Sequence, residues 1–269
     1  MKYFNYIALF IISFAYNCTV VNAQDHPTLI KQLNQKADYI NTDQLGNLYL
    51  VRKNFVFMYN KDGDSLRAFN SQKFGEIEQI DCSDPYKILV FFKDYNIIVF
   101  LDNYLSQNGE AIDLQSINLD QVSLACHSRE AGFWAFDQIK QKVMHLNPKF
   151  KITHETVNFT QWFGQQLSPN FMIEYNNQLY LNDPQLGLFI FDHFGTFLRK
   201  VVISNARSIQ IKESIISYLT NNKYCIHSTQ KLETQCNTIE LNNQIDGYRK
   251  EKGRLYILND KKVSIYKTN

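Results

Sequence analysis

One short segment brings together residue types that perform acid–base chemistry. His127-Ser128-Arg129-Glu130 places an imidazole, a hydroxyl, a guanidinium and a carboxylate at four successive positions. Side chains adjacent in sequence rarely face one another, whereas a nucleophile and its base must lie within hydrogen-bond distance. We therefore expect a polar corner between two strands here rather than an active site. No serine-hydrolase, zinc-protease, phosphate-loop or dinucleotide-binding motif occurs in the chain.

Cysteine usage suggests disulfides rather than a metal site. After the amino-terminal leader the chain contains Cys82, Cys126, Cys225 and Cys236, with no Cys-x-x-Cys and no Cys/His cluster. Cys225 and Cys236 fall on successive predicted strands, and a bond between them would stabilise the fold by roughly 2–3 kcal/mol. Cys82 and Cys126 occupy equivalent places in neighbouring repeats, so they form either a second disulfide or two buried thiols.

Four aromatic residues fall in predicted loops and are candidates for an interaction surface. They are Tyr95, Tyr104, Trp162 and Phe163. Loops on a rigid scaffold commonly carry function, and aromatic side chains are enriched at protein interfaces. The alternative is that some of them fold back as local core.

The first 23 residues have the features of a secretory signal peptide. Lys2 supplies the basic start, Tyr6 to Phe14 form an apolar core, and Val21-Asn22-Ala23 fits a cleavage site before Gln24. The expected division is a signal peptide over 1–23 and one domain over 24–269. We expect an exported protein in the periplasm or at the outer membrane, with no membrane span in the mature chain.

Two alternatives to a cleaved leader remain open. A membrane anchor is disfavoured because Asn17 and Asn22 interrupt the apolar run, and a span needs about 20 apolar residues. A lipoprotein would be acylated at Cys18, but Tyr16 and Asn17 fit poorly before such a cysteine.

Composition excludes some classes of partner. The chain has 28 Lys and Arg against 26 Asp and Glu, a net charge of +2, without a basic stripe. This balance argues against nucleic acid or an anionic membrane as the main partner. Aromatic residues make up 14% of the chain while Gly and Pro are few, which is typical of packed strands.

The chain repeats itself with a period of about 40 residues, the range of propeller blades. Ile88–Phe92 and Ile97–Leu101 are two five-residue apolar runs, which predict strands buried on both faces. Each repeat has such a central pair, preceded by a strand with a polar corner and followed by a more polar outer strand. The central pairs are expected at 48–51 and 55–60, 88–92 and 97–101, 132–137 and 142–147, 178–182 and 188–192, 215–219 and 224–227, and 253–259 and 263–267.

The sixth repeat ends at Asn269 without an outer strand, and Thr28–Leu33 is a spare strand before the first repeat. If Thr28–Leu33 fills the outer position of the last blade, every blade has four strands and no edge is left unpaired. The sequence therefore predicts an all-β, six-bladed propeller with four-stranded antiparallel blades, closed by its amino-terminal strand.

Two sequence units resemble the repeats of six-bladed propellers of the NHL and bacterial envelope types. They are Asp43-x-x-Gly46-Asn47-Leu48-Tyr49-Leu50 and Phe189-Ile190-Phe191-Asp192-x-x-Gly195. The second and fifth repeats lack the glycine of the first unit. The resemblance implies a binding or scaffold propeller that meets its ligand at one end of the ring, and it transfers no catalytic residue and no cofactor.

Three functions follow as hypotheses. The first is a non-enzymatic scaffold or accessory subunit that binds envelope proteins. The second is a propeller hydrolase or lyase with a channel metal, for which Glu76, Glu78, Asp120 and Glu174 are the acids expected near the channel. The third is a carbohydrate-binding module that uses the loop aromatics.

Overall fold

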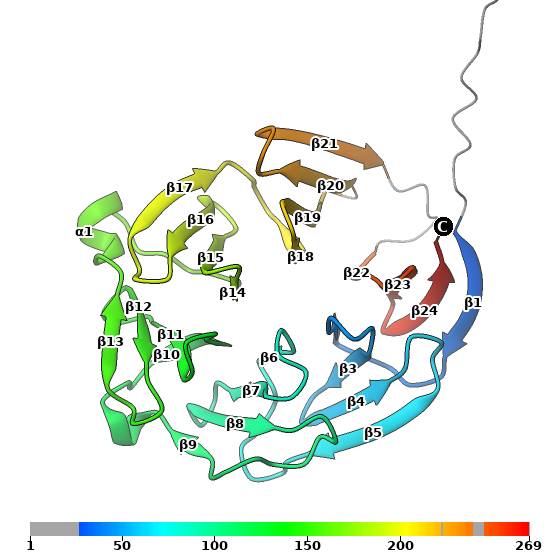
Figure 1. The fold of residues 1–269 in the computed structure, drawn as a ribbon, viewed down its shortest axis with the longest axis horizontal. Coiled ribbons are helices and arrows are strands. Elements are labelled where there is room, and N and C mark those ends of the chain that lie inside the picture. The colour runs from blue at the N-terminus through cyan, green and yellow to red at the C-terminus, as the bar shows by residue number, and fades with distance from the viewer. Residues whose placement is uncertain (1–26, 222, 239–244, 269) are drawn as a thin grey trace, which may run out of the picture.

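The computed structural model describes residues 27–221, 223–238 and 245–268. The chain forms six four-stranded antiparallel sheets, arranged as blades in a ring around a central channel (Figure 1). The predicted leader, including Cys18 and the cleavage site, lies outside the described residues. No helix within the described ranges is long and apolar enough to cross a bilayer.

Each blade runs from an inner strand at the channel to an outer strand at the rim. The first three blades, from inner to outer strand, are β2 (Tyr39–Thr42), β3 (Leu48–Arg52), β4 (Phe55–Tyr59) and β5 (Ser65–Asn70); β6 (Gln79–Asp81), β7 (Ile88–Phe92), β8 (Ile97–Leu101) and β9 (Ile112–Asp113); and β10 (Val122–His127), β11 (Phe133–Asp137), β12 (Lys142–Leu146) and β13 (Ile152–Glu155). The next three are β14 (Phe171–Tyr175), β15 (Gln178–Asp183), β16 (Gly187–Asp192) and β17 (Phe197–Val201); β18 (Arg207–Lys212), β19 (Ile215–Thr220), β20 (Lys223–Ser228) and β21 (Glu233–Thr238); and β22 (Gly247–Glu251), β23 (Arg254–Asn259), β24 (Lys262–Lys267) and β1 (Thr28–Leu33).

The ring closes as the sequence predicts. β1 pairs antiparallel with β24, from Thr28 opposite Lys267 to Leu33 opposite Val263, so the two ends of the chain complete one blade. β1 follows the outside of that blade in Figure 1. The predicted fold class, the number of blades and the role of Thr28–Leu33 are confirmed.

Alternation along the central strands explains why their apolar runs are unbroken. In β7, Ile88, Val90 and Phe92 pack into the core between the first two blades. Leu89 and Phe91 point the other way, into the core between the second and third blades. Because successive strand residues point to opposite faces and both faces meet another blade, every residue of β7 is buried.

The outer strand of the second blade is shorter than its sequence suggests. A strand is expected over 110–114, but β9 pairs with β8 only at Asp113 and Ile112. Leu114 is fully buried and begins the turn of 3-10 helix at Gln115–Ile117 instead. The loop 102–111 continues the pairing in its place, since Gln107 forms a bridge with Leu101 and the Asn108 N–H donates to the Phe100 carbonyl at 2.8 Å.

The aspartates of the two sequence units are turn residues. Asp43 is buried, and its Oδ1 accepts the backbone N–H groups of Leu45 and Asn47, both at 2.9 Å. Asp192 likewise accepts the N–H groups of Phe194 and Thr196, at 2.9 and 2.8 Å. Such side-chain bonds fix the backbone of a tight corner. The units therefore specify the corners of blades rather than a reaction.

Two of the four cysteines form a disulfide bond, and the other two are free thiols. Cys225 and Cys236 face each other on β20 and β21 and form a disulfide, with their Cα atoms 4.1 Å apart. Cys82 and Cys126 are separate buried thiols rather than a second disulfide. Burial raises the pKa of both thiols well above the usual value, so they remain protonated and unreactive.

The ring has two different faces. Turns from inner to second strand and from third to outer strand, such as 43–47 and 60–64, lie on one side, here called the hairpin face. Turns from second to third strand and the links between blades, such as 53–54 and 71–78, lie on the other, called the entry face.

Candidate functional site

Side-chain hydrogen bonds join the inner strands across blade boundaries. Asn41 on β2 donates to the Ile80 carbonyl of the second blade at 3.1 Å. Gln210 on β18 and Lys250 on β22 exchange two bonds, both at 3.1 Å, as Gln210 donates to the Lys250 carbonyl and accepts its backbone N–H. Unpaired polar groups in a narrow channel would be costly, so these side chains hold the blades in register.

Two cavities of about 260 and 330 Å³ occupy the channel. Both are lined by Asp81 and Arg249, and this shared section is here called the channel waist. Asp81 is buried, and burial raises the pKa of its carboxyl group. Its two oxygens accept the backbone N–H groups of Ser83 at 2.8 Å and His127 at 2.9 Å. Asp81 therefore links the second and third blades.

The acids predicted around the channel are dispersed. Glu78 lines the channel, at its entry-face end. Glu76 lies at the surface, 3.7 Å from the Lys53 ammonium, and Asp120 is exposed. Glu174 is buried, with bonds to the third blade. In the described ranges, no group of three or more His, Cys, Asp or Glu side chains is placed to hold a metal ion.

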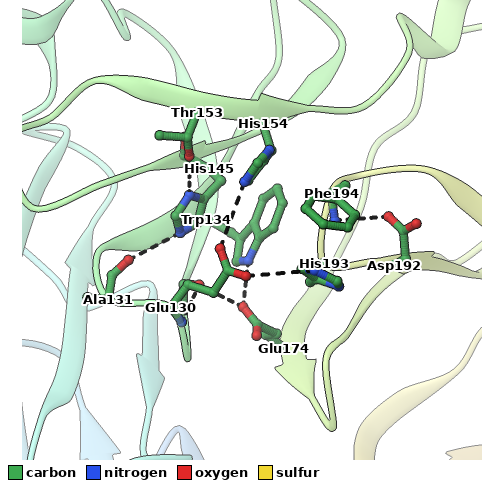
Figure 2. A network of polar contacts seen from close by, with 11 residues as sticks. Glu130, Ala131, Trp134, His145, Thr153, His154, Glu174, Asp192, His193 and Phe194 are labelled. Atoms are coloured by element: carbon green, nitrogen blue, oxygen red, sulfur yellow. Dashed lines mark hydrogen bonds and ion pairs between the residues drawn. The ribbon is translucent and has the colours of Figure 1, made fainter.

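The His127–Glu130 segment diverges, and its last residue enters a second polar network. Ser128 donates to Glu174 Oε2 at 2.8 Å, beside the Trp134 Nε1–H, which donates to the same oxygen at 2.7 Å. Figure 2 shows Glu130 between two imidazoles from separate elements. Its carboxylate lies 3.8 Å from Nε2 of His154 on β13 and 3.8 Å from Nε2 of His193 in the β16–β17 turn.

A column of rings supports this network on the hairpin face. His145 contacts Trp134 in a tilted arrangement with centroids 4.9 Å apart, His154 follows at 5.7 Å from His145, and Phe194 lies 5.2 Å from His154 (Figure 2). His145 Nε2 contacts the Ala131 carbonyl at 3.2 Å, so it carries the proton, and burial lowers the pKa of this histidine. His145 is therefore an uncharged ring in the same network as the exposed Glu130. Chemically, a carboxylate that orients imidazoles suits general-base chemistry.

The predicted interaction residues divide into two classes. Tyr95 lies exposed on the entry face and Tyr104 exposed on the hairpin face. Trp162 and Phe163 are not in a loop but in helix α1 (Phe159–Phe163), which is capped by the Asn158 side chain. This helix packs over the third and fourth blades, with Trp162 against Phe197 and Phe163 against Phe189, their centroids 4.6 and 4.9 Å apart. Phe163 is partly buried by this packing, whereas Trp162 is 43% exposed and remains a candidate interaction residue.

Sequence reasoning found one member, Tyr104, of a group of exposed aromatics called here the aromatic arc, and missed the other three. The arc consists of Tyr86, Tyr104, Phe150 and Phe194, which are 41–62% exposed and lie in hairpin-face turns of three consecutive blades. The turn motifs marked these positions as corners but gave no sign of which corners carry aromatics outward. Beside Phe150 a groove of about 410 Å³ opens between the second and third blades, where β9 is short.

Comparisons with known proteins identify the fold. No protein-family model and no curated protein matches this chain. A streptogramin B lyase is similar with a TM-score of 0.63 and 11% identity, over 91% of this chain and 98% of that one. The WD40 domain of Neurospora crassa Pan2 has a TM-score of 0.56 and 10% identity, over 87% and 89%.

A catalytically inactive virginiamycin B lyase from Staphylococcus aureus, solved with quinupristin, has a TM-score of 0.59 and 11% identity, over 86% of this chain and 80% of that one. At these identities the likeness concerns the fold alone, which WD40 domains and lyases share. The chain is a six-bladed β-propeller.

Proposed function

We propose that this chain is an exported binding propeller of the cell envelope, which holds a partner protein against its hairpin face. The observation that carries the proposal is the aromatic arc, one member of which, Phe150, lines the groove. Exposed apolar residues scattered singly are ordinary, but four exposed aromatics on one face of three consecutive blades are typical of protein interfaces.

The groove offers an apolar floor to such a partner. It is lined by Phe100, Phe133 and Phe150, together with Ala111 and Ile112. The turns that carry the arc are anchored by Asx-type hydrogen bonds, such as Asp102 Oδ1 accepting the Tyr104 N–H at 2.8 Å. A partner would therefore meet prearranged side chains and lose little affinity to ordering them.

Two cations border these aromatics and indicate the chemistry of the partner. The Lys87 ammonium lies 4.6 Å from the Phe100 ring centre, and the Arg67 guanidinium lies 5.4 Å from that of Tyr104. Glu110 and Asp113 line the same groove, so its charge is mixed and favours a partner segment that combines apolar anchors with charged side chains of both signs. Export is supported by the leader-like amino terminus and by the Cys225–Cys236 bond, since such bonds persist in oxidising compartments.

Binding should depend on the arc. Replacing Tyr104 and Phe150 together by alanine should reduce recovery of a stoichiometric partner from envelope extract about tenfold or more, because central aromatic anchors carry most of an interface's energy. The measurement is affinity capture with quantitative mass spectrometry. Tyr95→Ala is the matched control, since Tyr95 is equally exposed but lies on the entry face. Equal recovery by wild type and the double variant, or no stoichiometric partner at all, would contradict the proposal.

Glu130 favours a second candidate, a propeller lyase or hydrolase with an imidazole base. This candidate requires that the wild-type chain consume a substrate such as quinupristin, and that Glu130→Gln slow consumption about a hundredfold, a usual scale of general-base catalysis. Loss of intact quinupristin is followed by chromatography. Glu110→Gln, at an acid in the hairpin-face loop 102–111, is the control. Intact quinupristin after prolonged incubation with wild type would count against this candidate.

A further inference from the structure

Arg249 is a cation without a carboxylate partner at the waist of the channel. It lies on β22 and lines both cavities. Its Nε approaches Asn41 Oδ1 at 3.3 Å and its Nη1 donates to its neighbouring Tyr248 carbonyl at 2.9 Å. Among the described residues, no carboxylate lies within ion-pair distance of this guanidinium.

The acidic side chains near Arg249 do not neutralise its charge. Asp81 shares the waist, but both of its oxygens are occupied by backbone N–H groups. Glu78 and Asp246 also line the channel and are exposed to solvent. Burial lowers the pKa of Arg249 to about 10, and the groups that oppose this effect are Cys82 and Tyr39 rather than a carboxylate. Arg249 is half-buried and still charged at neutral pH, so its charge is partly desolvated and has no carboxylate partner among the described residues.

The surroundings of Arg249 are also short of hydrogen bonds. The Tyr39 hydroxyl and Gln79 Oε1 are buried without a partner of hydrogen-bond geometry, and both residues line the same cavity as Arg249. Unpaired polar groups and unpaired charges are expensive in protein interiors. The other polar side chains of the inner strands, such as Asn41 and Gln210, are occupied in the bonds between blades. The Tyr39 and Gln79 atoms are covered and do not reach a ligand, so the guanidinium of Arg249, which lines both cavities, is the group that the waist offers to one.

We propose that Arg249 and the channel waist form a binding site for a carboxylate group, separate from the hairpin-face interface. A planar guanidinium matches the two oxygens of a carboxylate. A single cation with acids at the channel mouth fits a monoanion better than a phosphate dianion. The cavities are at the small end of the usual ligand-pocket range. They fit either a small carboxylic acid or the terminal carboxylate of an extended peptide.

Calorimetry on the mature chain tests the site and separates the two sources. The probes are butyrate, an N-acetyl tripeptide with a free carboxylate, the same tripeptide as its amide, and inorganic phosphate. At least one carboxylate probe should bind wild type more tightly than phosphate does. Tighter binding of butyrate would identify a small acid as the source. Binding of the free tripeptide but not its amide would identify a peptide terminus.

Two variants of Arg249 and one control variant test whether the carboxylate probe binds at the channel waist. Arg249→Gln should weaken the carboxylate probe about tenfold or more, whereas Arg249→Lys should retain part of the binding because it keeps the charge and loses the planar fork. Arg199→Gln, on the outer strand β17, makes the same change in net charge and should bind as wild type. Arg249→Gln should also melt no lower than wild type, since it removes an uncompensated charge. Equal binding by wild type and Arg249→Gln, including no binding by either, would overturn the proposal.

Carboxylate binding at the channel waist can be tested separately from partner binding at the hairpin face. The Tyr104 and Phe150 double variant should bind the carboxylate probe as wild type does, because the arc lies in outer turns and Arg249 on an inner strand. A double variant that loses the probe while remaining folded would contradict the separation of the two sites.

Discussion

Removing residues 27–33 from the mature chain should prevent it from forming a stable, monomeric ring. These residues contain β1, the outer strand of the last blade. Without it, β24 exposes an unpaired edge, and the core that contains Val263 and Ile265 loses Leu33. Burial of a leucine contributes about 1.5–3 kcal/mol, and five paired positions are lost with it. The sum is a large part of the roughly 5–15 kcal/mol that stabilises a domain.

Light scattering coupled to gel filtration, together with urea unfolding, measures this effect. We expect the truncated chain to aggregate, to pair through its open edge, or to unfold at much lower urea. Leu29→Ser with Ile30→Ser is the control, because both side chains are exposed on β1 and the strand is retained. Such surface changes usually alter stability by less than about 0.5 kcal/mol. A truncated monomer with the wild-type unfolding midpoint would show that β1 is dispensable.

Trp134→Ala should destabilise the protein by about 3–5 kcal/mol, the range for truncating a large buried aromatic. Trp134 is 1% exposed and belongs to the core between the third and fourth blades. Its loss leaves a cavity and also removes the Nε1–H donor from Glu174. A buried carboxylate that loses a donor adds a further penalty.

A double-mutant cycle separates the two contributions. Trp134→Phe retains much of the ring and removes the donor, while Glu174→Gln removes the charge that the donor stabilises. Urea unfolding of both single variants and the double variant should reveal a coupling of about 0.5–3 kcal/mol, as expected for residues in contact. Additive single effects would assign the role of Trp134 to packing alone, and a loss below about 1 kcal/mol for Trp134→Ala would contradict the cavity argument.

The sequence predicts the six-bladed fold because its apolar runs and its turn signals are both consistent with that fold. The run Ile88–Phe92 is apolar throughout, which only burial on both faces explains, and β7 alternates between two cores. Turn signals such as Asp192-x-x-Gly195 mark the corners. The missing outer strand and the spare Thr28–Leu33 then determine how the ring closes.

The candidate sites were less accessible to sequence reasoning because distant elements assemble them. Glu130 meets His154 and His193, which come from two different blades. Arg249 lies in a polar strand, and its isolation depends on where neighbouring blades direct their acids. No short-range pattern records either fact.

Helix α1 is different, because a local signal for it is present. Asn158 caps its start by accepting the Gln161 N–H at 2.9 Å, and Gly164 ends it with a positive φ of 73°. An Asn and a Gly that bracket Phe159–Phe163 are ordinary helix boundaries. The sequence nevertheless predicts a loop here, because a segment of five residues between strands is shorter than most helices.

The pairing of the first strand with the last also constrains how the protein acquires its structure. Blades one to five each use one continuous stretch of chain and can pair as soon as that stretch is made, but the sixth waits for Val263 to reach Leu33. Contacts between residues so far apart in sequence slow folding. The seam beside the final blade is therefore the last part of the molecule to form, and until then the partly built molecule presents two bare sheet faces to its surroundings.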